Sequence, residues 1–274
     1  MDRRLHPATT RLAHSSLAGQ ISLPLTDGTA TLVSVPLADL LDGPSGARER
    51  QLILGETFHL IDSDQGFAFG FAQKDGYCGW LKENELTPMT PDIVPSHWVA
   101  TPGTHLYGGP KVQHRELAAL CLGARIRVID QAGDWAQTLH GFVPARHLLP
   151  IGMHLADVVG VAEALAGTPY LWGGNSRAGC DCSGLVQMAH LACGIPCPSD
   201  SDLQENLGKE VSETDPAQRG DLLFWRGHVA LVVDRDRLIH ANAHSMSVAY
   251  ERIHDCILRI AEQGGGAVTH RRRL

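Results

Sequence analysis

The 274-residue chain lacks the features that would place it in a membrane, on an export route or on a nucleic acid. It has no run of about twenty apolar residues, so no segment is predicted to cross a bilayer as a helix. The first residues, MDRRLHPATTRLAHSSLAGQI, contain basic side chains but no continuous apolar stretch, which predicts no secretory signal and a cytoplasmic protein. The net charge is −7, and cations cluster only in the tail His270–Leu274, which we interpret as a solvated chain end. Nucleic-acid binding is therefore not expected.

Patterns that bind metals or phosphates are also missing. Cys180 and Cys182 are separated by one residue, which is tighter than the Cys-x(2–4)-Cys spacing of zinc knuckles. His240 and His244 would share a face only on a helix, and the local pattern is strand-like. The glycine-rich stretch Gly173–Gly179 is not followed by the Lys-Ser/Thr of a phosphate-binding loop. We expect no metal and no cofactor, and the odd number of seven cysteines predicts free thiols.

The most informative segment runs from Tyr170 to Val186 and reads YLWGGNSRAGCDCSGLV. It places Cys182 directly after Asp181, at the start of a stretch whose apolar residues recur at helical spacing until Gly194. A cysteine in the first turn of a helix lies at the positive end of the helix dipole, which favours the nucleophilic thiolate. The pattern predicts a catalytic cysteine, and the alternative is a small buried cysteine on an ordinary helix.

A catalytic cysteine needs a base, and two histidines downstream are suitably spaced. The apolar, β-branched segment His228–Val233 is followed by the polar residues 234–236 and by Leu238-Ile239-His240. This pattern predicts two strands joined by a tight turn, with His228 and His240 close together on adjacent strands. One imidazole could take the Cys182 proton while the other fixes its orientation. The alternative is a chance pair, since the chain has fifteen histidines.

Several separated motifs carry a family resemblance. They are Tyr170-x-Trp172-Gly173-Gly174, Asp181-Cys182-Ser183-Gly184-Leu185, Arg219-Gly220-Asp221-Leu222, Gly227-His228-Val229-Ala230 and Ile239-His240-Ala241. In this order they resemble the NlpC/P60 family of papain-like cysteine peptidases, which cleave bacterial cell-wall peptides. The resemblance covers roughly residues 157–270.

The resemblance implies roles for individual residues. Cys182 would be the nucleophile, His228 the general base and His240 the residue that orients it. Tyr170 would help to polarise the scissile carbonyl, together with backbone N–H groups at the helix start. The neighbouring motif residues Trp172, Asp181 and Ser183 are expected to contact the substrate.

The first 150 residues have a different character, with short apolar runs and almost no helical periodicity. Short strands are predicted over 50–61, 66–73 and 77–86, with Asp75-Gly76 as a hairpin turn. A similar order recurs over 100–149, in which Gly141-Phe142-Val143 and Leu148 match Gly79-Trp80-Leu81 and Leu86. This arrangement resembles two bacterial SH3-type barrels in tandem.

The predicted architecture is therefore α+β, with a papain-like catalytic domain preceded by two all-β SH3-like barrels. An N-terminal extension and the first barrel occupy residues 1–90, and the second barrel occupies 91–152. The peptidase domain covers 153–274, and its first helix is expected over about 156–166, ending at Gly167. The oligomeric state is not predicted.

The arrangement is similar to family members that act on free murein peptides as γ-D-glutamyl-L-diamino acid endopeptidases. In these enzymes an acidic and a tyrosine side chain of the first barrel and an acidic residue of the peptidase domain surround the free amine of an N-terminal L-Ala. The matching positions are Tyr77, Asp200, Ser201 and, less closely, Glu56. The family more often has Arg where Ser199 stands.

The expected function is thus hydrolysis of the bond between γ-D-Glu and a diamino acid in peptides released from the cell wall, without a cofactor. One alternative is an exported peptidoglycan hydrolase whose SH3 domains bind the wall. The other is a non-catalytic module that binds wall peptides, against which the intact Cys182, His228 and His240 argue.

Overall fold

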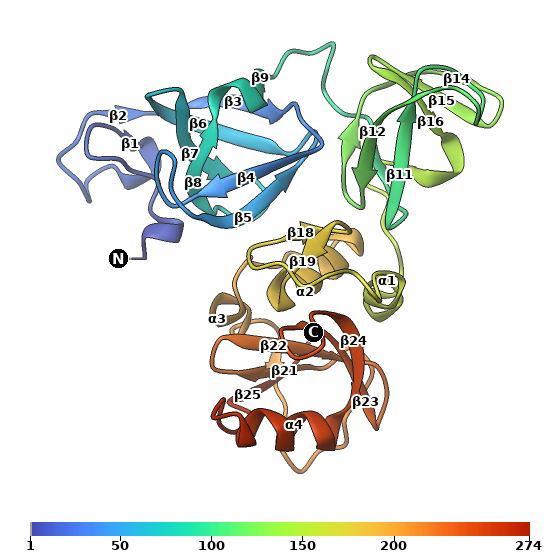
Figure 1. Ribbon diagram of the computed structural model, residues 1–274. Helices are drawn as coiled ribbons and strands as arrows, with labels where there is room; N and C mark the ends of the chain where they lie inside the picture. Colours follow the sequence, from blue (N-terminus) through green and yellow to red (C-terminus); the bar gives the residue numbers. More distant parts are fainter. Residues whose placement is uncertain (1) are drawn as a thin grey trace. The chain divides into compact units, whose positions relative to one another are not determined.

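The computed structural model describes residues 2–274, which form two compact units. The first unit ends at Met153 and the second comprises His154–Leu274. Figure 1 traces both units along the chain from blue to red, and each is described here by itself. Within residues 2–274, no helix combines the length and the apolar character needed to cross a membrane.

The first half of the first unit is built almost entirely of strands. Short elements precede the main sheet: η1 (Arg3–Leu5), β1 (Ala13–His14), η2 (Ser15–Leu17) and β2 (Leu25–Thr26). The sheet strands are β3 (Thr29–Val33), β4 (Leu37–Leu41), β5 (Arg48–Ile53), β6 (Thr57–Asp64), β7 (Phe67–Ala72), β8 (Cys78–Lys82) and β9 (Leu86–Pro88), with the 3₁₀ helix η3 (Glu83–Glu85) before β9. They pair in the order β5-β4-β8-β7-β6-β3-β9 around buried side chains such as Leu40, Phe58 and Leu81.

The Asp75-Gly76 turn has the predicted form. Gly76 has a φ of +75°, a left-handed conformation that glycine adopts without steric cost. The Tyr77 N–H donates to the Asp75 carboxylate, and β7 and β8 pair directly beside the turn. The predicted strand over 50–61 is in fact two strands, because the chain turns at Leu54-Gly55-Glu56 between β5 and β6.

The second half of the first unit repeats part of this pattern. Its elements are β10 (His97–Val99), β11 (Gly103–Tyr107), β12 (Glu116–Cys121), β13 (Arg125–Ile126), β14 (Val128–Ala132), β15 (Trp135–Thr138), β16 (Gly141–Pro144), η4 (Ala145–His147) and β17 (Leu148–Pro150). In both halves a strand is followed by one turn of 3₁₀ helix and a three-residue strand: β8-η3-β9 and β16-η4-β17. The equivalence predicted from the two Gly-aromatic motifs is thus visible in the backbone.

The repeat does not by itself show that either half closes into a barrel. Across residues 2–274, β5 and β9 remain the unpaired edges of the seven-stranded sheet. The second half forms a three-stranded sheet (β13-β10-β17) and a five-stranded sheet (β12-β11-β16-β15-β14). The structure confirms two β-rich segments, whereas two closed barrels stay a prediction.

The two halves of the first unit meet at Gly55. Its φ is +75°, and a Cβ built there would lie 2.1 Å from the Arg125 carbonyl oxygen. The Arg125 N–H donates to the Leu54 carbonyl (2.8 Å), and Leu54 packs against the apolar core of the second half. Only glycine fits at position 55 without moving the two halves apart.

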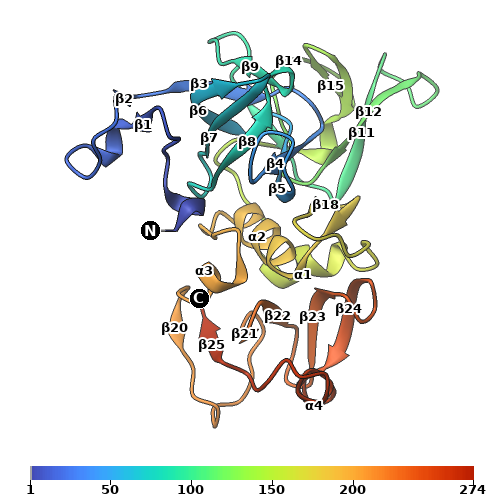
Figure 2. The ribbon, with the colours of Figure 1, turned by 60° about the vertical axis from the view of Figure 1, so that its left-hand side comes forward.

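The second unit is an α+β fold, as predicted. Its helices are α1 (Val158–Ala164), α2 (Cys182–Ala192), α3 (Ser201–Gln204) and α4 (Ile253–Glu262), and its strands are β18 (Asn175–Ser176), β19 (Gly179–Cys180), β20 (Lys209–Glu210), β21 (Leu222–Trp225), β22 (His228–Val232), β23 (Arg237–Asn242), β24 (Ser247–Arg252) and β25 (His270–Arg273). Six strands form one sheet in the order β20-β25-β21-β22-β23-β24. Figure 2 shows α1, α2 and α3 on one side of this sheet and α4 on the other.

The interpretation of the C-terminal tail as a solvated end is wrong. Residues His270–Arg273 form β25, which pairs with β20 and β21. Arg271 and Arg273 both donate to the carboxylate of Asp221, whose side chain is fully buried. The arginine side chains that suggested a solvated tail therefore bind Asp221 and hold β25 in the sheet.

Candidate active site

Cys182 is the first residue of α2, and Asp181 caps this helix. The Gly184 N–H donates to Asp181 Oδ1 (2.7 Å), and the Gly173 N–H donates to Oδ2 (2.9 Å). One carboxylate therefore satisfies a helix-end donor and ties the preceding loop to it. The Ser183 hydroxyl also donates to Oδ1 (3.2 Å). Asp181 and Ser183, predicted to contact substrate, are both buried and build the helix start.

Gly184 allows the loop to approach α2 closely. A Cβ at this position would lie 2.4 Å from the Gly174 carbonyl oxygen and 2.7 Å from the Asn175 side chain. The loop itself is held by β18 and β19 and by a parallel bridge between Tyr170 and Cys180. These contacts explain the glycine that follows Asp-Cys-Ser and fix the backbone on both sides of Cys182.

The two histidines lie on neighbouring strands, as predicted. His228 begins β22 after the turn residue Gly227, whose φ is +74°, and His240 lies in β23. Helix α2, which carries Cys182, packs against both strands. His228 Nε2 lies 2.8 Å from His240 Nδ1, so the imidazoles share one hydrogen bond.

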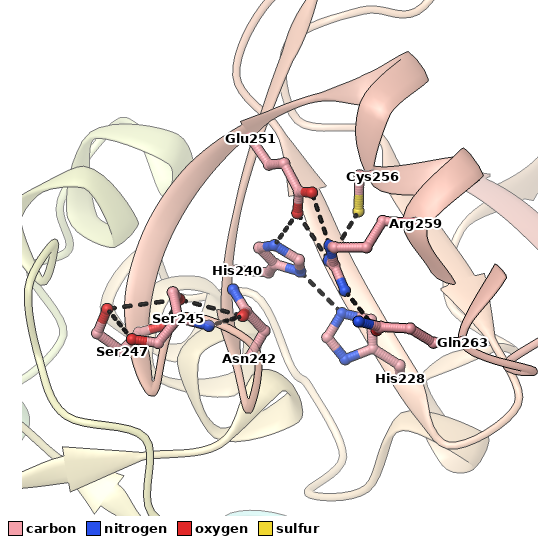
Figure 3. A network of polar contacts seen from close by, with 9 residues as sticks. All are labelled: His228, His240, Asn242, Ser245, Ser247, Glu251, Cys256, Arg259 and Gln263. Atoms are coloured by element: carbon pink, nitrogen blue, oxygen red, sulfur yellow. Dashed lines mark hydrogen bonds and ion pairs between the residues drawn. The ribbon is translucent and has the colours of Figure 1, made fainter. Parts of the chain in front are cut away.

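The hydrogen-bonded chain continues beyond His240, as Figure 3 shows. His240 Nε2 lies 3.1 Å from Glu251 Oε2. Arg259 of α4 donates to both carboxylate oxygens of Glu251, from Nε (2.8 Å) and Nη2 (2.7 Å). Four side chains from β22, β23, β24 and α4 therefore form one linear network.

The charges along this network are set by burial and by Arg259. Burial lowers the pKa of His228 to about 3, assisted by the neighbouring His240, so this imidazole is neutral near pH 7. Burial also lowers the pKa of His240, although Glu251 opposes that shift. The hydrogen bonds from Arg259 and then His240 hold the pKa of Glu251 far below its usual range, so this carboxylate is ionised.

Three possible metal ligands converge at the same place. Atoms of His240, Glu251 and Cys256 lie within 4.8 Å of one another. The Arg259 guanidinium contacts Cys256 Sγ (3.8 Å) as well as the Glu251 carboxylate. A metal cation would have to enter beside this fixed positive charge, so the cluster is better suited to a hydrogen-bond network than to a metal.

All seven cysteines are free thiols. Burial raises the pKa of Cys180 to about 12, and the neighbouring Asp181 adds to this shift. Burial likewise raises the pKa of Cys78, Cys121 and Cys256 to about 12. These thiols stay protonated at neutral pH and are poor nucleophiles.

The remaining predicted residues of the second unit lie around α2. Tyr170 is half-buried, and its N–H donates to the Met246 carbonyl. Trp172 is 69% exposed. Asp200 is the N-terminal cap residue of α3, and the buried Ser201 is the first residue of that helix.

Glu56 and Tyr77 belong to the first unit. Lys74 Nζ lies 2.9 Å from Glu56 Oε1, and both side chains are 7% exposed. The Ile53 N–H donates to Glu56 Oε2 (3.0 Å). Glu56 therefore has an internal ammonium partner, which sequence reasoning missed because Lys74 lies eighteen residues away. Tyr77 is buried in the apolar core of the first sheet.

Family models match both units of the chain. Residues 167–259 match the NlpC/P60 family. Residues 40–86 match the bacterial dipeptidyl-peptidase SH3 domain. The first match contains Cys182, His228, His240 and Glu251, and the second covers β5 to β8.

Relatives extend the similarity over most of the chain. Dipeptidyl-peptidase 6 of Lysinibacillus sphaericus is 30% identical over 191 residues, which cover 61% of this chain and 69% of that protein. The γ-D-glutamyl-L-lysine dipeptidyl-peptidase of Bacillus subtilis is 28% identical over 225 residues, covering 73% and 74%. The crystal structure of an NlpC/P60 family protein from Bacillus cereus superposes with a TM-score of 0.75 at 20% identity, covering 89% of this chain and 99% of that one.

The fold and the matches thus define a peptidase of a cysteine-dependent class that carries a bacterial SH3 domain. The chain belongs to the NlpC/P60 family, which confirms the resemblance that its motifs suggested.

Sequence reasoning missed Glu251 and Arg259. Glu251 lies in β24, whose residues other than Val248 are half-buried or exposed, a pattern that gives no sign of a functional carboxylate. The family motifs also end at Ala241. The sequence could have indicated Glu251 through the pairing of β24 with β23. That register places Glu251 opposite Leu238, on the same face of the sheet as His240 two residues further along.

Proposed function

We propose that this protein hydrolyses the bond between γ-D-Glu and the following diamino acid in short murein peptides with a free N-terminal L-Ala. The observation that carries the proposal is the similarity to a γ-D-glutamyl-L-lysine dipeptidyl-peptidase over 73% of this chain, which includes parts of both units. Removal of a dipeptide from the amino end corresponds to cleavage after the second residue, which is γ-D-Glu in these peptides. Such a reaction would recycle cell-wall peptides in the cytoplasm.

In the proposed mechanism Cys182 is the nucleophile and His228 is the base. His228 Nε2 is engaged by His240, which leaves Nδ1 to take the thiol proton. The thiolate attacks the γ-carbonyl of D-Glu, and Tyr170 with backbone N–H groups at the start of α2 stabilises the oxyanion. The amine of the diamino acid leaves with the proton from His228, and water then hydrolyses the thioester.

Within the second unit, recognition of the free amine is assigned to Asp200, with Ser201 and Trp172 as further residues that contact the substrate. Glu56 is engaged within the first unit through its pair with Lys74. A charge-assisted hydrogen bond contributes about 1.5–3 kcal/mol. Loss of two such bonds on acetylation of the amine would lower kcat/KM by roughly 10²–10⁴-fold.

The test compares L-Ala-γ-D-Glu-diaminopimelate, the corresponding L-Lys peptide, their N-acetyl forms and purified sacculi, with mass spectrometry of the products. We expect L-Ala-γ-D-Glu from the free peptides, little from the acetylated ones and no release from sacculi. Equal rates on free and acetylated peptides would contradict amine recognition. Efficient release from sacculi would instead support a wall hydrolase whose SH3 domain binds the wall.

A pair of variants on α3 separates charge recognition from helix packing. Asp200→Asn should lower kcat/KM for the free peptide by roughly 10- to 100-fold, because one charge-assisted bond is lost. It should have little effect on the acetylated peptide. Asp202→Asn, at an exposed position two residues further along, is the matched control and should leave both rates unchanged.

A further inference from the structure

The hydrogen-bonded chain ends in a carboxylate that can accept hydrogen bonds but has no proton to donate. Glu251 is ionised, so its oxygen at 3.1 Å requires His240 Nε2 to carry the hydrogen. A neutral His240 with its proton on Nε2 has a lone pair on Nδ1. His228 Nε2, 2.8 Å away, must then be the donor in the bond between the two rings.

This sequence of donors determines the state of His228 itself. A neutral imidazole carries one proton, and Glu251 places it on Nε2 through His240. Nδ1 of His228 is then unprotonated and able to accept a proton. In the opposite arrangement His240 would donate from Nδ1, and the His228 proton would lie on Nδ1, where it would block that acceptor.

Arg259 fixes the direction in which the hydrogen bonds from His228 through His240 to Glu251 run. Its two donors occupy Oε1 and Oε2 of Glu251, with side-chain exposures of 17% for Arg259 and 20% for Glu251. The bidentate contact fixes the plane of the carboxylate and lowers its basicity, so Glu251 accepts the His240 hydrogen bond without taking the proton. His240 is fully buried, and rotating its ring would break the bonds to both neighbours.

We propose that Glu251, held by Arg259, is a positioning residue that sets the tautomers of His240 and His228 and so keeps His228 Nδ1 available as the base for Cys182. This inference rests on the proposed cysteine-peptidase chemistry, and it is independent of which murein peptide is cleaved. When His228 takes the thiol proton at Nδ1, its Nε2–H continues to donate to His240. The positive charge then faces the acceptor Nδ1 of His240, whose Nε2–H donates to the Glu251 carboxylate.

The decisive variant is Glu251→Gln. Arg259 donates to both oxygens of Glu251, so the amide nitrogen of Gln faces one Arg259 donor in either orientation: it takes the place of Oε2 and also faces His240, or it takes the place of Oε1. In the first case His240 Nε2 becomes an acceptor and the tautomers of both histidines reverse. We expect kcat to fall on the order of 100-fold, within the range that a positioned general base contributes, with KM changed less than threefold.

The matched control is Glu163→Gln in α1. Glu163 also contacts an arginine, at 3.1 Å from Arg219, and accepts from the Tyr250 hydroxyl, but it lies outside the network. The kcat of Glu163→Gln should stay within twofold of the wild-type value. Equal kcat losses in the two variants would overturn the proposal, because any disturbed carboxylate–arginine pair would then suffice.

A spectroscopic readout distinguishes positioning from structural support. Long-range ¹H–¹⁵N correlation spectra of histidine-labelled protein, assigned with His228→Asn and His240→Asn, report which ring nitrogen is protonated. The wild type should show both rings protonated on Nε2, and Glu251→Gln should shift His240 to Nδ1. A wild-type His240 protonated on Nδ1 would overturn the proposal even if Glu251→Gln failed to fold.

The outcomes also separate this inference from the proposed function. Failure to cleave any murein peptide, with the Nε2 tautomers intact, would reject the proposed substrate and leave the role of Glu251 standing. Full activity of Glu251→Gln on a murein peptide would reject the positioning role and leave the substrate assignment standing.

Discussion

Asp221 is a buried carboxylate of the second unit that pairs with two arginines, and its loss should be strongly destabilising. Its side chain is fully buried. Oδ1 accepts from Arg273 Nε (2.6 Å), and Oδ2 accepts from Arg271 and Arg273 (2.9 Å each) and from the Gln218 N–H (3.0 Å). Asp221→Asn keeps the shape but leaves two arginines without a counter-charge.

The magnitude follows from the cost of breaking a buried ion pair. Removing one partner of such a pair costs about 3–5 kcal/mol, because the remaining charge stays desolvated. The sum of four separate hydrogen bonds would suggest a larger loss of stability, but their contributions are not additive within one network. We therefore expect about 3–5 kcal/mol less stability, a large share of the roughly 5–15 kcal/mol of a typical domain.

Urea denaturation, with hydrogen exchange of peptides from β21 and β25, measures this effect within the second unit. Asp157→Asn is the control: Asp157 caps α1 and pairs with Arg219, both side chains are largely exposed, and Asn caps a helix equally well. It should cost no more than about 1 kcal/mol. A loss below 1 kcal/mol for Asp221→Asn, or unchanged exchange in β21 and β25, would refute the reasoning. If Asp221→Asn lowers the exchange protection of β21, peptidase activity should fall as well, because β21 pairs with the strand that carries His228.

Three further predictions concern thiols, acid and the first unit. Cys182→Ala should abolish both turnover and inactivation by iodoacetamide, whereas Cys180→Ala should keep activity because burial keeps that thiol protonated; a Cys182→Ala variant that still cleaves peptide would contradict this. His228 has a pKa lowered to about 3 by burial, so between pH 6.5 and 3 only the unfolded chain gains its proton and stability falls as pH falls. The loss at pH 5 should be about 2 kcal/mol from this group, visible as a flatter pH dependence of the urea midpoint in His228→Gln. Gly55→Ala should lower the thermal midpoint of the first unit, because its Cβ would lie 2.1 Å from the Arg125 carbonyl oxygen; an unchanged midpoint would show that the two halves can separate freely.

Much of the site could be predicted because it depends on short-range order. Helical periodicity after Cys182 and the Gly194 stop match α2, which ends at Ala192. The hairpin that joins β22 and β23 brings His228 and His240 together, since a tight turn leaves little freedom in register. The catalytic roles of these residues stay predictions, and so do the residues assigned to the amine of the substrate.

The sequence by itself determined the family, the α+β character of the second unit, the helix that begins at Cys182 and the contact between the two histidines. Only the tertiary structure decided which charges meet: Glu251 with Arg259, Glu56 with Lys74, and Asp221 with Arg271 and Arg273. The physical reason is that backbone periodicity and turn chemistry are properties of neighbouring residues, whereas a buried charge requires a partner wherever the packing of strands and helices brings one within about 3 Å.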